Sequence, residues 1–187
     1  MDGCRDAAAI GAGGPTPLTS RGRRAAGASS ALAVALALVG SAAFGESGEP
    51  LAAAFERIEG GKLHLADLRG GPVLLELWAT WCAPCKQQAI ILEDLRAELE
   101  ERGVTVLAVD IGEKPKVVRE YLAEHPKSYP VLLDRPQVLP RLLDINELPV
   151  LALLDRQGKV AATHLGLAQP DEVRGLLGGL ASSSTAD

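Results

Sequence analysis

The sequence of 187 residues is poor in aromatic side chains, which make up 3% of it, and it holds only one methionine and three cysteines. A hydrophobic core must therefore be built from leucine, valine, isoleucine and alanine, and a hydrophobic content of 47% is sufficient for one. The formal net charge is −5 and no basic stripe is present, so we expect no nucleic-acid partner. Phosphate-binding glycine loops and the serine, histidine and aspartate order of hydrolases are also missing.

The first 45 residues differ in composition from the rest of the chain. Three arginines between Arg21 and Arg24 precede an apolar run from Ala31 to Val39, and small residues follow it. This order is typical of a secretory signal peptide, with cleavage near Ala43 or Gly45. An uncleaved membrane anchor and a cytosolic disordered tail are the alternatives, because the apolar run has about half of the roughly 20 residues that span a bilayer. From the signal peptide we expect the protein in the periplasm or on the extracytoplasmic face of the inner membrane.

After the leader, we expect a linker at 46–52, one folded domain at 53–181 and a flexible tail at 182–187. Hydrophobic periodicity and turn residues predict the elements of the domain. In chain order they are a hairpin in 54–70, a strand at 72–78, a helix at 83–103, a strand at 104–111, a helix at 114–125, a strand at 129–134, a helical turn in 136–145, a hairpin in 148–166 and a helix at 169–181. This order predicts an α/β fold with a mixed central sheet and helices on both faces.

The second predicted helix, 114–125, is amphipathic. We expect one of its faces to turn Val117, Val118, Tyr121 and Leu122 toward the core. Pro126 follows the end of the helix, as is common where a helix stops.

Cys82 and Cys85 form a CxxC pair where the strand 72–78 gives way to a helix. Cys4 lies in the leader, so this pair holds the only cysteines of the predicted exported domain. The free N–H groups and the dipole of the first helical turn favour a thiolate at Cys82, and Pro84 suits a position where no N–H is needed. Cys85 lies almost one turn further along, within disulfide reach, and can resolve a mixed disulfide formed at Cys82. We expect Cys82 to be the more exposed thiol.

A metal site is the competing interpretation of this pair. A zinc site usually needs four ligands, and His64, His125 and His164 have no metal-motif spacing to a neighbour. A module that holds Cu(I) between the two thiolates is the other metal alternative, although soft ligands are few. We expect no metal and no cofactor other than the redox-active disulfide itself.

The segment LELWATWCAPCK resembles the active-site segment of thioredoxin-fold proteins, and WATWCxPC is most similar to the exported TlpA/ResA-type thiol–disulfide oxidoreductases. The resemblance extends over residues 50–181. It implies a thioredoxin fold with an N-terminal β-hairpin and a central αβ insertion. It also implies an exported enzyme that takes electrons from a membrane thiol donor and reduces disulfides in other exported proteins, usually in cytochrome c or copper-site assembly. A disulfide oxidase with the same residues is the alternative.

The resemblance also assigns roles at the site. It makes Cys82 the attacking thiol and Cys85 the resolving thiol, with Trp81 packed beside them. Pro149 would be a cis-proline, and the backbone of Leu148 would lie against the disulfide, where it can pair with a substrate strand.

Two positions depart from the family pattern. Many relatives have an acid three residues after the second cysteine and a proline two residues further on, where this chain has Gln88 and Ile90. A proton-handling role is therefore not carried over to Gln88. Without the kinking proline, we expect a straighter helix.

Glu76 lies in the middle of the apolar strand, six residues before Cys82. Burial of a carboxylate is costly unless it has a partner or a role. Its position matches the buried acid that thioredoxins keep beneath the resolving cysteine, which implies a proton acceptor for Cys85. The alternative is an acid on a half-exposed strand face that pairs with a lysine.

Overall fold

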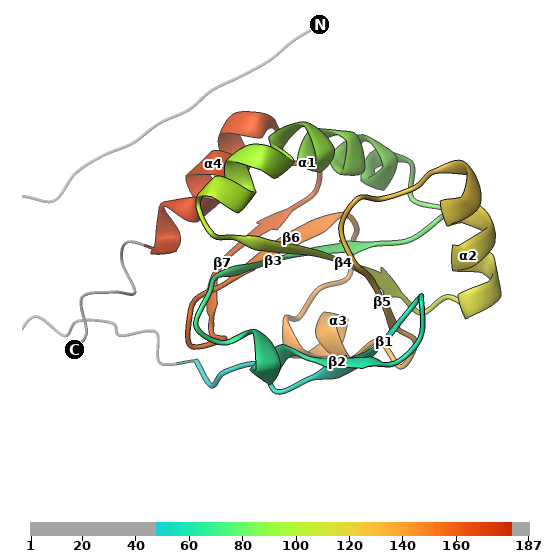
Figure 1. Cartoon of the computed structure of the whole chain (residues 1–187), viewed down its shortest axis with the longest axis horizontal. Coiled ribbons are helices and arrows are strands. Elements are labelled where there is room, and N and C mark those ends of the chain that lie inside the picture. The colour runs from blue at the N-terminus through green and yellow to red at the C-terminus, as the bar shows by residue number, and fades with distance from the viewer. Residues whose placement is uncertain (1–47, 181–187) are drawn as a thin grey trace, which may run out of the picture. The chain divides into compact units, whose positions relative to one another are not determined.

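The computed structural model describes residues 48–180 (Figure 1). The predictions of a leader, of its cleavage or anchoring, and of a flexible tail at 182–187 fall outside the described residues. Within the described part of the chain, no helix combines the length and apolar character that crossing a membrane requires.

Within residues 48–180, seven strands form one mixed sheet in the order β2-β1-β5-β4-β3-β6-β7. The strands are β1 (Ala54–Arg57), β2 (Lys62–His64), β3 (Val73–Trp78), β4 (Thr105–Ile111), β5 (Val131–Asp134), β6 (Val150–Leu154) and β7 (Val160–Leu165). Strand β3 pairs in parallel with β4 and antiparallel with β6. The strand that leads to the cysteines therefore lies inside the sheet, with a neighbour on each side.

The helices cover both faces of this sheet. They are the 3-10 helix η1 (Leu65–Leu68) and the α-helices α1 (Ala83–Glu101), α2 (Pro115–Glu124), α3 (Val138–Leu142) and α4 (Pro170–Leu177). Helices α1 and α4 lie together over one face, and α3 lies on the opposite side (Figure 1). The α/β fold class predicted from the sequence, with its N-terminal hairpin and its inserted helix and strand α2–β5, is confirmed.

The buried residues of β3 alternate between two hydrophobic clusters. Leu74 and Trp78 pack with Leu92 of α1 on one face, whereas Leu75 and Leu77 pack on the other face. A strand that is buried on both faces has a continuous apolar sequence, which is why this segment lacks the usual polar alternation. The face under α1 is the one that Glu76 shares.

One face assignment is wrong. Val117 was expected to turn toward the core with its neighbours on α2, but its side chain is 41% exposed. Val118 is fully buried, and Tyr121 and Leu122 pack against the same cluster at the i+3 and i+4 positions. Since successive helical residues are turned by about 100°, Val117 lies at the edge of this face.

Candidate active site

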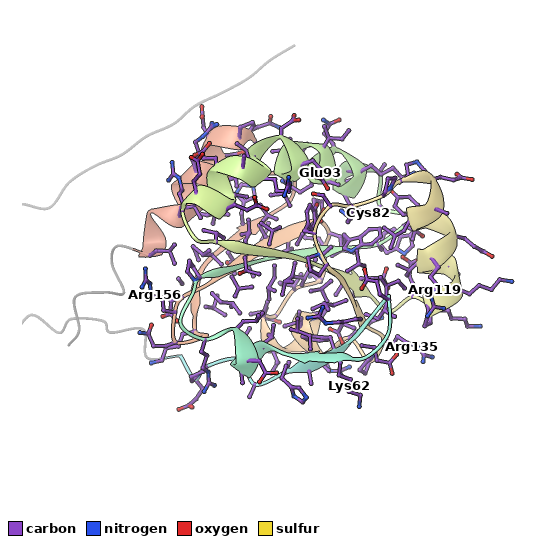
Figure 2. All side chains as sticks on the ribbon, in the orientation of Figure 1. Lys62, Cys82, Glu93, Arg119, Arg135 and Arg156 are labelled. Carbon is purple, nitrogen blue, oxygen red and sulfur yellow. A yellow bond between two sulfur atoms is a disulfide. The ribbon has the colours of Figure 1, made fainter. Side chains whose placement is uncertain are left out.

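Cys82 and Cys85 are joined by a disulfide, with their Cα atoms 5.3 Å apart. Cys82 is the N-cap residue of α1, and its sulfur accepts a hydrogen bond from the backbone N–H of Cys85 at 3.2 Å. Pro84 lies in the first turn, where its missing N–H leaves no hydrogen bond unmade. Figure 2 shows Cys82 near the start of α1, whereas charged side chains such as Lys62 and Arg135 lie at the periphery of this view. The predicted pair is thus placed where a helix N-terminus stabilises a thiolate.

The two cysteines do not differ in exposure as expected. Cys82 is 3% exposed and Cys85 is 1% exposed, because both join the hydrophobic cluster beneath α1 while they are bonded to each other. Any difference in their accessibility must therefore arise after reduction.

Trp81 directly precedes Cys82, and Leu148 directly precedes Pro149. The Trp81 side chain is 71% exposed, and the Leu148–Pro149 peptide bond is cis, as the family resemblance implied. Both residues line a cavity of about 210 Å³, which extends to Ile145 and Glu147 in the loop before β6. Among the described residues, the backbone N–H and C=O of Leu148 make no hydrogen bond. An exposed aromatic ring, a hollow and the unpaired backbone of Leu148 thus lie together, and the ring belongs to the residue directly before Cys82.

Glu76 is buried and paired. Its side chain is 0% exposed, and its Oε2 accepts hydrogen bonds from Lys127 Nζ at 2.8 Å and from the Tyr129 hydroxyl at 3.0 Å. Lys127 Nζ also lies 4.8 Å from the centre of the Trp78 ring, a cation–π arrangement. The structure therefore combines parts of both sequence-based alternatives, because the acid is fully buried and also has a lysine partner.

Burial has the largest effect on the pKa of Glu76. Loss of hydration raises the pKa of this carboxyl group, and the charge and hydrogen bond of Lys127 and the hydrogen bond of Tyr129 only partly offset the rise. The pKa of the Tyr129 hydroxyl is also raised, by burial first and then by the nearby Glu76 charge. A buried carboxyl group with a raised pKa is a candidate for proton transfer at a functional site.

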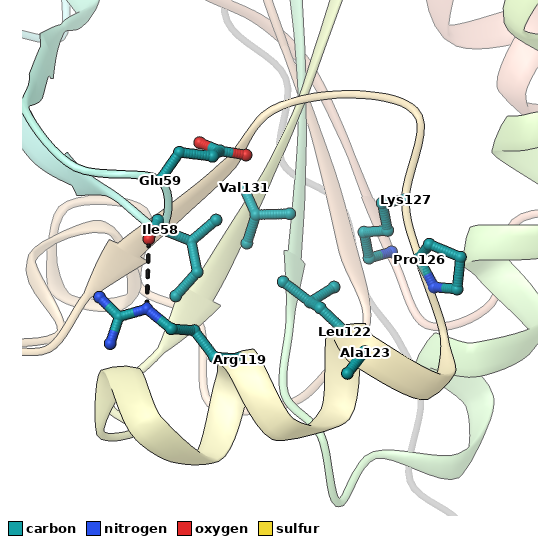
Figure 3. A pocket seen from close by; sticks show the side chains of 8 residues that line it. All are labelled: Ile58, Glu59, Arg119, Leu122, Ala123, Pro126, Lys127 and Val131. Atoms are coloured by element: carbon teal, nitrogen blue, oxygen red, sulfur yellow. Dashed lines mark hydrogen bonds between the residues drawn. The ribbon is translucent and has the colours of Figure 1, made fainter.

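Lys127 connects this buried pair to a surface groove. Its side chain is only 4% exposed, yet it forms one end of a cavity of about 340 Å³ between α2 and the turn of the β1–β2 hairpin (Figure 3). Arg119 donates a hydrogen bond to the Ile58 carbonyl at 3.4 Å along the same groove. The groove brings solvent close to the lysine that contacts Glu76.

Gln88 and Ile90 have different surroundings. Gln88 is fully buried, and its Oε1 accepts a hydrogen bond from the backbone N–H of Ala168 at 2.7 Å. It thereby connects α1 to the segment before α4. Ile90 is 55% exposed, and α1 continues past it without interruption to Glu101.

Three polar residues near the site were missed from the sequence. Thr80 lies between β3 and the cysteines, and it donates two hydrogen bonds to Glu113, which follows β4. Asp110, at the end of β4, is fully buried beside them. A charged residue inside the apolar run VTVLAVDI was the available signal for Asp110. No sequence pattern indicated the contact between Thr80 and Glu113, which are 33 residues apart.

Potential metal ligands do not gather in the described part of the chain. Among residues 48–180, no three histidine, cysteine, aspartate or glutamate side chains lie close enough together to hold a metal ion. The chemistry that the described geometry offers is exchange at the Cys82–Cys85 disulfide.

Comparison with known proteins agrees with this geometry. The sequence profile of the Redoxin family matches residues 47–178. The chain is 31% identical over 120 residues to the thiol-disulfide oxidoreductase ResA of Bacillus thuringiensis (strain Al Hakam). The aligned residues make up 64% of this chain and 69% of that relative. It is also 31% identical over 111 residues to ResA of Bacillus subtilis (strain 168), and this alignment covers 59% of this chain and 62% of that relative.

Solved structures give the same result for the fold. A protein from Chlorobium tepidum described as a thiol:disulfide interchange protein DsbE superposes with a TM-score of 0.63 at 30% identity, over 70% of this chain and 94% of that one. StoA from Bacillus subtilis superposes with a TM-score of 0.58 at 20% identity, over 68% of this chain and 98% of that one. At that lower identity the likeness concerns the fold alone.

Proposed function

The chain belongs to the Redoxin family as a ResA/TlpA-like thiol–disulfide oxidoreductase with a thioredoxin fold, and from this premise we propose that it is an exported reductase of disulfides in other exported proteins. The observation that carries the proposal is the Cys82–Cys85 disulfide at the N-terminus of α1. The residues between the cysteines, Ala83 and Pro84, have no charged or hydrogen-bonding side chain to stabilise a thiolate further. A cysteine pair whose reduced form is strongly stabilised acts as an oxidant. Since Ala83 and Pro84 provide no polar group for such stabilisation, we expect this pair to act as a reductant.

The proposed cycle is a pair of thiol–disulfide exchanges. The Cys82 thiolate of the reduced enzyme attacks one sulfur of a client disulfide, so that the client S–S bond breaks and one client cysteine leaves as a thiolate. Cys85 then loses its proton and attacks the Cys82 sulfur, which releases the second client cysteine. Two electrons have passed to the client, and the enzyme holds the Cys82–Cys85 disulfide. A membrane thiol donor restores the dithiol by the same steps in reverse, and no other redox group is needed.

Glu76 is the proposed acceptor of the Cys85 proton. It lies on the face of β3 that α1 covers, and burial raises the pKa of its carboxyl group. A carboxyl group with a raised pKa binds a proton more readily than a free carboxyl group, and it can serve as general base in one direction and general acid in the other. Lys127 contacts Glu76 and lines the groove of Figure 3, which provides a route for proton exchange with solvent.

The client is proposed to bind as an extended segment across Trp81 and Leu148. The unpaired backbone of Leu148 can form strand-like hydrogen bonds with such a segment, in the manner of strand addition. The cavity of about 210 Å³ beside these residues can accept a client side chain. Immature cytochrome c and copper-site assembly proteins, the usual clients of this kind of enzyme, are the first candidates.

The direction of the reaction is tested by the reduction potential of the cysteine pair. Equilibration of the protein with thiol buffers of known ratio, followed by alkylation and mass analysis, measures it. A reductase should have a potential more negative than about −200 mV, whereas strong oxidants lie near about −120 mV. A value close to the latter would make the protein a disulfide oxidase.

Export is tested separately. The arginine-led apolar segment from Arg21 to Ala43 motivates it. A reporter that is active only outside the cytoplasm, fused after Gly60, should be active, and the same fusion without residues 1–45 should not. If the fusion that keeps residues 1–45 were inactive, the protein would be cytoplasmic.

A further inference from the structure

The turn between β3 and α1 is held by a residue that is distant in sequence. The backbone N–H of Thr80 donates to Glu113 Oε2 at 2.6 Å, and its hydroxyl donates to Glu113 Oε1 at 2.7 Å. Hydrogen bonds to a carboxylate are stronger than neutral ones, and two of them from one residue fix both its position and its rotation. Since Cys82 follows Thr80 by two residues, this contact controls where α1 begins.

Glu113 is itself fixed by the end of β4. Its backbone N–H donates to Asp110 Oδ1 at 3.1 Å, and the N–H of the preceding Gly112 donates to the Asp134 carbonyl at 3.1 Å. Gly112 has a φ of +86°, a conformation that favours glycine. The loop that carries Glu113 is therefore built to present this carboxylate at one place.

Asp110 is a buried acid that lies beside Glu113. Its side chain is 0% exposed, and Oδ2 has no hydrogen-bond partner among the described residues. The charged groups that face it are Glu113 and Asp134, both acidic, so a second negative charge there is unfavourable. Burial, followed by the contact with Glu113, raises the pKa of Asp110 to about 8. Below that pH Asp110 is neutral, so it adds no negative charge beside the Glu113 carboxyl group.

We propose that Glu113 is a positioning residue of the thiol–disulfide reaction, which holds Thr80 so that Cys82 stays at the N-terminus of α1, and that Asp110 keeps Glu113 in place by accepting the hydrogen bond from its backbone N–H. The role is separate from proton transfer by Glu76, because Glu113 acts on the turn before the cysteines. It also links the αβ insertion to the active site, since Glu113 lies directly before α2. When Asp110 ionises, repulsion between the two carboxylates loosens this hold.

The test compares Glu113→Ala, Glu113→Gln and Glu124→Ala in exchange of reduced enzyme with a small-molecule disulfide. Glu113→Ala removes both hydrogen bonds and should slow exchange about 10-fold at pH 7, within the range that misplacement of a reacting group costs. Glu113→Gln can accept from the Thr80 N–H and donate to its hydroxyl, so it should recover to within about threefold of the wild type. Glu124 is exposed on α2, and Glu124→Ala should match the wild type.

The pH profile gives the second readout. When the rate is expressed per Cys82 thiolate, exchange by the wild type should slow as pH rises through about 8, and Asp110→Asn, which donates a hydrogen bond but cannot ionise, should remove this change. If Glu113→Ala does not fold, Thr80→Val, which loses one of the two hydrogen bonds, should slow exchange about threefold. Rates of Glu113→Ala equal to those of Glu124→Ala, or of Glu113→Gln equal to those of Glu113→Ala, would overturn the proposal. So would a slowing of the rate per Cys82 thiolate near pH 8 that persists in Asp110→Asn.

Discussion

Lys127 and Glu76 form an ion pair inside the protein, with Nζ 2.8 Å from Oε2 and side chains that are 4% and 0% exposed. Tyr129 donates a further hydrogen bond to the same oxygen. Breaking a buried pair by removing one partner is more costly than removing both, because the remaining charge is left without compensation. Variants of the two residues can therefore separate the contribution of Glu76 to protein stability from its proposed role in proton transfer.

Glu76→Gln removes the charge at nearly constant size. We expect it to lower the free energy of unfolding by about 3 kcal/mol, since Lys127 loses its counter-charge. We also expect it to slow the resolving step by about 10- to 100-fold, because the proton acceptor is lost. Urea denaturation measures the first effect, and stopped-flow turnover of a disulfide substrate between about pH 6 and 9 measures the second.

The double variant Glu76→Gln with Lys127→Met is the matched control. It removes both charges, so most of the lost stability should return while the resolving step stays slow. Superimposable pH profiles for the wild type and Glu76→Gln would show that Glu76 handles no proton.

Substitution of each cysteine should have a different consequence. Cys82→Ser should abolish reduction of insulin disulfides, because the attacking thiolate is missing. Cys85→Ser should accumulate mixed disulfides with substrate, since the resolving thiol is missing. Non-reducing gels and mass spectrometry detect the adduct. Equal loss of activity without any adduct in Cys85→Ser would contradict the assigned roles.

Asp110 should make stability depend on pH. Its pKa is raised from 3.8 to about 8, so between these values the folded protein holds a proton that the unfolded chain releases. Stability contributed by this group is therefore fully present below about pH 4 and is lost as pH rises toward 8. Asp110→Asn abolishes the effect, and its free energy of unfolding should rise relative to the wild type between about pH 5 and 8. A constant difference across urea denaturation curves in this range would refute the prediction.

Two glycines should respond to alanine in opposite directions. Gly112 has a φ of +86°, and an added Cβ would lie 2.6 Å from Gln137 Nε2, so Gly112→Ala should lower stability by about 1–2 kcal/mol. Gly175 lies within α4, and an added Cβ there meets no atom within 4 Å. Gly175→Ala should raise stability by about 0.5–1 kcal/mol, the usual gain in a helix. Thermal unfolding of both variants tests the pair, and a shift of both in one direction would be inconsistent with it.

The elements of the fold were predictable because local patterns determine them. The run PVLLELW is continuous and apolar, which is typical of a strand with both faces covered, and β3 is such a strand. Gly60 and Gly61 both have positive φ, which explains why a glycine pair predicted the first hairpin. Val117 was misassigned because a helix turns by about 100° per residue, so a residue at the edge of an apolar face can be exposed.

The partners of the buried polar groups were not predictable, because they depend on contacts between distant segments. Glu76 was recognised as an unusual acid, yet its partner Lys127 lies 51 residues away and precedes another strand. Thr80 and Glu113 meet only because β3 and β4 are parallel neighbours, with Trp78 opposite Asp110. A sequence shows that a buried charge needs a partner, and only the register of the sheet shows which residue it is.

The position of β3 between β4 and β6 bears on how the protein is made. Synthesis proceeds from the N-terminus, so both cysteines emerge long before β6, which completes the hydrogen bonding of their strand. A chain that has reached only β5 carries the dithiol without Pro149 and without a second neighbour for β3 on that side. Until the last hairpin is added, such a chain is an open pair of thiols that other disulfide catalysts can oxidise. The incomplete chain is then itself a substrate of other disulfide catalysts, and it becomes a catalyst only when the sheet is complete.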